Sequence, residues 1–161
     1  MIDETLTKLY EKSIKSHWNQ SALSDYKGKT ITYGDVGRNI AYLHYLFENQ
    51  GLEKGDKVAV LGKNSINWGL IYLATVTYGA VIVPILPDFQ PKDVHYIVNH
   101  SEARLLFVEN SIYDSLDDSV MENVEAMISL VDLSILSTTR ENLYGEIRYA
   151  RGKFWSDINP T

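Results

Sequence analysis

The longest run without a charged residue extends from Asn64 to Pro87. Its first half, Ile66 to Tyr78, is apolar on nearly every side of a helix, and Gly79 ends that pattern. Its second half, Ala80 to Val83, is short and β-branched, as buried strands are. Because Gly79 and Pro84 divide the run, it predicts a deeply buried helix followed by a buried central strand, and no membrane span.

Helical and strand patterns alternate through the rest of the chain. Apolar spacing predicts a helix over residues 3–17 and another that starts after Thr32, with Asp35 in the capping-box position, and ends at Gly51. Two extended runs at residues 21–33, joined by Lys27-Gly28, predict a β-hairpin. The remaining helical patterns are a helix from Pro91, a partly helical acidic segment at 111–125 and a helix at 141–151.

Four short apolar runs predict neighbouring parallel strands at residues 57–61, 80–83, 104–108 and 127–131. Strands that alternate with helices indicate an α/β fold: a layered α-β-α arrangement around a mostly parallel sheet, with the 66–78 helix packed on it. A helix and a short hairpin precede this layered part. We expect residues 1–161 to form a single domain, because no linker-like stretch divides the chain.

Such sheets bind ligands at the carboxyl ends of their strands. In this chain those ends lead into four loops, Gly62–Ser65, Leu86–Asp88, Glu109–Ser111 and Asp132–Ser134. Composition narrows the possible ligands. The net charge is -6 and the pI is about 5.1, and no basic patch of the kind that binds nucleic acid is visible in the sequence. The absence of cysteine excludes a disulfide framework and a thiolate metal site, and the first residues lack a signal-peptide pattern.

Motifs that carry chemistry are missing from the sequence. It contains no G-x-x-x-x-G-K-[ST] loop, no G-x-G-x-x-G fingerprint and no G-x-S-x-G elbow, and Gly34-Asp35-Val36-Gly37 is interpreted as a helix start. His95 and His100 are five residues apart, which is poor spacing for two metal ligands on one helix face, and the other two histidines, His17 and His44, stand alone.

Two further groups of residues favour structural interpretations. The carboxylates Asp114, Asp117, Asp118, Glu122 and Glu125 lack the spacing of a calcium loop and are interpreted as a solvated helix face. The tryptophans Trp18, Trp68 and Trp155 are too scattered for a stacking platform and are assigned to packing. We therefore predict no catalytic, cofactor-binding or metal-binding residue in this chain, and the substrate-binding residues stay undefined.

Several segments resemble the acyl-adenylate-forming superfamily. Thr30–Val36 resembles its first motif, a Thr-Tyr pair before the first large helix, and Gly79–Pro84 resembles its second. Gly51–Leu61, followed by Asn64-Ser65 and Trp68, is similar to the segment between them. The continuation is similar to fatty acyl-CoA and acyl-carrier-protein synthetases at Pro91, Tyr96-Ile97, Ser101–Ala103 and Leu105–Val108, so the resemblance covers roughly Ser21 to Val108.

The resemblance implies a reaction. Members of this superfamily join a carboxylate to ATP, release pyrophosphate, and pass the acyl group to a thiol. The resemblance further implies that the full-length protein to which this chain would belong, here called the parent, is a long-chain fatty acid–CoA ligase. The parent would use ATP, Mg²⁺ and coenzyme A or an acyl carrier protein, although aryl and aminoacyl acids stay open as substrates. We expect a cytoplasmic protein without a membrane span, and peripheral attachment of the parent to a membrane stays open.

The family's phosphate loop, adenine motif, ribose-binding aspartate and catalytic lysine have no matching positions in residues 1–161. We therefore expect an amino-terminal fragment of a longer ligase, without the phosphate-binding loop and the C-terminal domain. Such a fragment should be inactive by itself, should bind no cofactor, and could self-associate through an exposed apolar face. The alternative is a stand-alone small α/β binding or interaction module, which the reading frame beyond Thr161 would distinguish.

Overall fold

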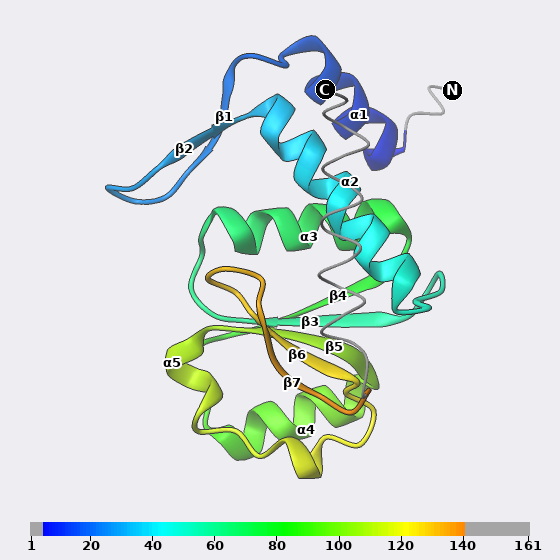
Figure 1. Cartoon of the computed structure of the whole chain (residues 1–161), viewed down its shortest axis with the longest axis vertical. Helices are drawn as coiled ribbons and strands as arrows, with labels where there is room; N and C mark the ends of the chain where they lie inside the picture. The colour runs from blue at the N-terminus through cyan, green and yellow to red at the C-terminus, as the bar shows by residue number, and fades with distance from the viewer. Residues whose placement is uncertain (1–4, 141–161) are drawn as a thin grey trace.

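The computed structural model describes residues 5–140, which build a sheet with helices on both faces and a separate hairpin (Figure 1). In chain order the first half contains α1 (Leu6–Ser16), β1 (Ser21–Ser24), β2 (Thr30–Thr32), α2 (Tyr33–Asn49), β3 (Lys57–Leu61) and α3 (Ile66–Tyr78). The second half contains β4 (Val81–Ile85), α4 (Pro91–Ser101), β5 (Ala103–Val108), α5 (Asn110–Tyr113), the 3₁₀ turn η1 (Asp118–Val120), β6 (Ala126–Ser129) and β7 (Ile135–Thr138).

The five-stranded sheet has the order β4-β3-β5-β6-β7. Its first four strands are parallel, and β7 runs antiparallel to β6. The α/β class, the mostly parallel sheet and the four neighbouring parallel strands are thus confirmed. The predicted central position of the strand after α3 was wrong, because β4 is an edge strand and Val81 is 47% exposed. No pattern had predicted β7.

The edge position explains how β4 accommodates Pro84. The backbone N–H of Val81 donates to the carbonyl of Asp56, at 2.8 Å, beside β3. Backbone groups alternate in direction along a strand, so Val83 and Ile85 also face β3 while Ile82 and Pro84 face away from it. A backbone N–H at position 84 would therefore point away from β3. Although proline has no N–H, its presence here removes no hydrogen bond between β3 and β4.

Alternation of side chains along the strands gives the sheet two apolar faces. Val58 and Val60 of β3 join one core cluster, whereas Ala59 and Leu61 join the other. Helices α2 and α3 cover the first face, and α4 covers the second (Figure 1). Five apolar residues of α2, which recur at helical spacing on one side of it, are buried in the first cluster: Val36, Ile40, Leu43, Leu46 and Phe47.

Helix α3 is less deeply buried than its apolar sequence predicts. Five of its residues are buried, and the others are half-buried, because α2 and the hairpin cover its outer side only in part. The helix ends at Gly79, which has a φ of 93°. Among residues 5–140, no helix combines the length and apolarity needed to cross a membrane.

Local signals at the helix ends were predicted correctly where they could be compared. Thr32 and Asp35 form the expected capping box, and Pro91 occupies the first turn of α4, as predicted. The structure also shows that Ser65 caps α3. The acidic segment at 111–125 is only briefly helical, in α5 and η1, so the interpretation of its carboxylates as one helix face was wrong. The predicted helix at 141–151 lies outside the described residues.

Candidate functional site

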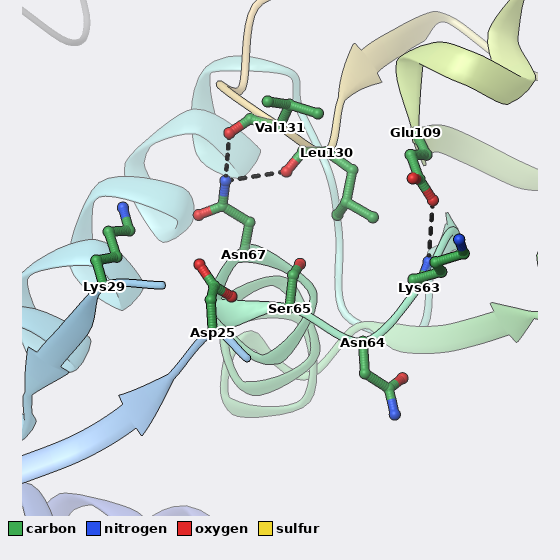
Figure 2. Close-up of a pocket in the computed structure, with 9 residues that line it drawn as sticks. All are labelled: Asp25, Lys29, Lys63, Asn64, Ser65, Asn67, Glu109, Leu130 and Val131. Carbon is green, nitrogen blue, oxygen red and sulfur yellow. Dashed lines mark hydrogen bonds between the residues drawn. The ribbon is translucent and has the colours of Figure 1, made fainter. Parts of the chain in front are cut away.

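Loops that follow three of the parallel strands meet the tip of the β1–β2 hairpin at the carboxyl edge of the sheet. They enclose a hollow of about 230 Å³ (Figure 2). This is the place where the topology of a parallel sheet predicts a ligand site. The lining residues are Asp25, Lys29, Lys63, Asn64, Ser65, Asn67, Glu109, Leu130 and Val131.

The amino end of α3 forms one wall of the hollow, and the protein's own side chains bind its free backbone donors. The Asp25 carboxylate accepts the Ile66 N–H at 2.7 Å, and the Ser65 hydroxyl oxygen accepts the Trp68 N–H at 3.2 Å. A helix amino end attracts anions through these N–H groups and its positive dipole end. In this structure the Asp25 carboxylate already supplies that negative charge.

A second wall is the turn after β6, which α3 fixes through Asn67. The Asn67 side-chain N–H₂ group donates to the carbonyls of Leu130 and Val131, at 2.9 and 2.8 Å (Figure 2). Buried Ser129 holds the same turn by accepting the backbone N–H groups of Val131 and Asp132. The conformation of this wall therefore depends on side chains that are far apart in the sequence.

Gly62, in the loop after β3, lies against the side chains of Leu130 and Glu109, which follow β6 and β5. A Cβ atom at Gly62 would lie 2.5 Å from the Leu130 side chain and 3.3 Å from Glu109. The Glu109 carboxylate accepts the backbone N–H of Lys63 at 3.2 Å (Figure 2). A larger residue at position 62 would require the Leu130 side chain to move.

The residues around the hollow do not fit a triphosphate. A phosphate cradle needs several free backbone N–H groups, whereas Asp25 and Ser65 already bind two of those at α3. The carboxylates of Asp25 and Glu109 would repel a phosphate, and the two lysines of the lining, Lys29 and Lys63, are both exposed. Among residues 5–140, no group of three or more His, Asp or Glu side chains is arranged to hold a metal ion.

The four histidines lie in separate environments. His44 Nε2 lies 2.9 Å from the Ala74 carbonyl and 3.0 Å from the Thr77 hydroxyl, and burial lowers the pKa of its imidazole. His95 Nε2 accepts the Asp117 N–H at 3.1 Å. His17 Nδ1 contacts the Ser13 carbonyl at 2.9 Å, and His100 stacks on Tyr96. Each histidine therefore has a structural contact of its own.

The acidic residues of the 111–125 segment divide among different partners. Asp117 accepts hydrogen bonds from the Ser119 hydroxyl and backbone N–H, which lower the pKa of its carboxyl group. Asp118 accepts the Ser137 hydroxyl at 2.6 Å, and Glu125 pairs with Arg104. These contacts tie the segment to β5 and β7.

Arg104 is the centre of a polar cluster at the opposite, amino edge of the sheet. Its guanidinium donates to Asp56 at 2.6 Å, to Glu125 at 2.8 Å and to the Gly51 carbonyl at 2.9 Å. Burial lowers the pKa of Arg104, but the bonds to Asp56 and Glu125 outweigh it and raise the pKa overall. Sequence analysis missed this cluster, because its members are 21 to 53 residues from Arg104 in the chain.

A larger hollow, of about 740 Å³, lies between α1 and α2. Trp18, Tyr10 and Ile14 line it, together with Ile40 of α2 and His44. Helix α1 contributes no buried residue, so its apolar side is only partly covered. The other two tryptophans were also assigned to packing. Trp68 stacks on Tyr72, and Trp155 lies outside the described residues.

Comparison with known proteins identifies the family. Residues 10–151 match the family model for AMP-binding enzymes. The chain belongs to this family. Surfactin synthase subunit 2 from Bacillus subtilis (strain 168) is 31% identical over 122 residues, which are 76% of this chain and 3% of that protein. The medium-chain fatty-acid–CoA ligase of Escherichia coli (strain K12) is 26% identical over 65% of this chain and 19% of the relative.

Solved structures of this family share the fold. The crystal structure of the anthranilate CoA ligase AuaEII matches with a TM-score of 0.75 and 20% identity, over 89% of this chain and 27% of that one. The N-terminal subdomain of Klebsiella oxytoca NpsA matches with a TM-score of 0.67 and 21% identity, over 81% of this chain and 31% of that one. This chain thus spans between 3% and 31% of the length of these four proteins.

Proposed function

We propose that this chain is the amino-terminal portion of an ATP-dependent acid–thiol ligase and forms part of the scaffold of its active site. The parent would activate a carboxylic acid as an acyl-adenylate, release pyrophosphate, and transfer the acyl group to a thiol. The observation that carries the proposal is the AMP-binding family match over residues 10–151. The resemblance of Thr30–Val36 and Gly79–Pro84 to family motifs supports it further.

We propose that the chemistry itself depends on other residues of the parent. Adenylation develops charge on the phosphates, and stabilising that charge requires positioned N–H donors, cationic side chains and a metal ion. At the carboxyl edge, Asp25 and Ser65 bind N–H groups of α3 that a phosphate would need. ATP, Mg²⁺ and the thiol substrate would therefore be bound by the complete ligase, and residues 1–161 would be inactive alone.

For the acid, our proposal is a fatty acid, with long-chain acids as the first to test. The resemblance of Leu86–Val108 to fatty acyl ligases supports this choice, as do matches to medium-chain and long-chain fatty-acid–CoA ligases. Matches to surfactin synthase and to an anthranilate CoA ligase keep aminoacyl and aryl acids as alternatives. Coenzyme A is the first thiol acceptor to test. An acyl carrier protein is the second, because one relative is a fatty acid–[acyl-carrier-protein] ligase. The proposed location is the cytoplasm, and attachment of the parent to a membrane surface stays open.

ATP–pyrophosphate exchange tests this proposal. The 161-residue chain and any longer product of the same reading frame would be assayed with a panel of fatty, aryl and amino acids. We expect no exchange by the 161-residue chain, and acid-dependent exchange by a longer product. Exchange by residues 1–161 alone would place the active site within this chain and would refute the scaffold role. A reading frame that stops at Thr161 would favour a stand-alone α/β module.

A further inference from the structure

We draw no further inference here: the strongest candidate, the apolar groove of about 740 Å³ between α1 and α2, is an open helix face among residues 5–140, and nothing in the structure shows what covers it.

Discussion

At the scale of single residues, Thr75 and Thr77 of α3 differ in how their hydroxyl groups are satisfied. Thr75 is fully buried, and its hydroxyl has no hydrogen-bond partner in the described structure. The Thr77 hydroxyl donates to the Leu73 carbonyl at 2.6 Å and lies 3.0 Å from His44 Nε2. A buried hydroxyl without a partner keeps its desolvation penalty, whereas a bonded one recovers it.

We therefore predict that Thr75→Val raises the free energy of unfolding by about 1 kcal/mol, because valine has the same shape without the unpaired hydroxyl. Thr77→Val is the matched control, and we expect it to lower the free energy of unfolding by about 1 kcal/mol. Urea unfolding at neutral pH measures both changes. If Thr75→Val destabilised the protein as much as Thr77→Val, the Thr75 hydroxyl would have a partner, such as a buried water molecule.

Asp35 gives a prediction about pH. Hydrogen bonds from the Thr32 backbone N–H, the Arg38 guanidinium and the Thr32 hydroxyl lower the pKa of Asp35 from 3.8 to about 2. A lowered pKa in the folded state stabilises the fold above the unfolded pKa, and this contribution disappears as the pH falls from about 4 to about 2. The side chain is 38% exposed, so solvent screens part of the effect.

We expect Asp35→Asn to lower the free energy of unfolding at pH 7, by up to about 1 kcal/mol for a weakened cap. The difference between the variant and the natural chain should shrink as the pH is lowered from 4 to 2. Urea unfolding at several pH values provides the measurement. A difference that stayed constant down to pH 2 would show that the charge of Asp35 does not contribute.

Sequence patterns predicted the residues with local partners and missed those with distant partners. Thr32 and Asp35 are three residues apart, so their spacing alone predicted the capping box. Asn67 bonds to the turn after β6, which is more than 60 residues away, and Arg104 bonds to Asp56 and Glu125. Those contacts exist only after the strands have paired, and no spacing rule could have indicated them.

At the scale of elements, the end of α4 carries a residue in an unfavourable conformation. Glu102 has a φ of 57° and a ψ of 38°, in the left-handed region where glycine usually ends a helix. For an L-residue with a Cβ atom this conformation costs roughly 1–2 kcal/mol. The ion pair of Glu102 with Lys57 has a separation of 4.0 Å, and the glutamate side chain is 73% exposed, so it offsets little of that cost.

Replacing Glu102 with glycine should therefore stabilise the protein. Relieving the backbone strain stabilises the folded state by more than the extra chain entropy of glycine stabilises the unfolded state. We therefore expect the free energy of unfolding to rise by about 0.5–1 kcal/mol. Glu102→Gln is the control, because it removes the charge but keeps the Cβ atom, and we expect no gain from it. Thermal unfolding of the unmodified chain and the two variants measures these changes in stability. If both variants were stabilised equally, the effect would come from the loss of the charge and not from the backbone conformation.

The strands show where periodicity is sufficient and where it is not. Residues 57–61 were predicted with the bounds of β3, because an apolar run between two turns is enough to define a buried strand. β7 was missed because Ile135–Thr138 becomes a strand by pairing antiparallel with β6, and no local pattern indicates that contact. The edge position of β4 could not be predicted either, because strand order depends on which strands pair.

At the scale of the whole molecule, large apolar side chains remain exposed at the carboxyl edge of the sheet. Leu86 follows β4 and is 63% exposed, and Val131 follows β6 and is 64% exposed. Tyr26, in the turn of the hairpin, is 90% exposed. If the chain is part of a longer ligase, as proposed, other residues of that ligase are the expected cover for such side chains. Exposed apolar surface of this kind promotes association.

We therefore predict that the 161-residue chain self-associates through this edge when it is studied alone. Its net charge of -6 opposes association at long range, so the test should be made at about 0.15 M salt, where charges are screened beyond about 8 Å. Sedimentation velocity over a range of concentrations would compare the natural chain with the double variant Leu86→Ser, Val131→Ser. We expect the double variant to remain monomeric at concentrations where the natural chain associates.

The matched control for this last prediction is Tyr96→Ser. Tyr96 is 67% exposed but lies on α4, on the second face of the sheet, so its loss should leave association unchanged. If Tyr96→Ser weakened association as much as the double variant, the contact would not be specific to the carboxyl edge. A natural chain that stayed monomeric at every concentration would contradict the prediction and would also weaken the case for a missing neighbour at this edge.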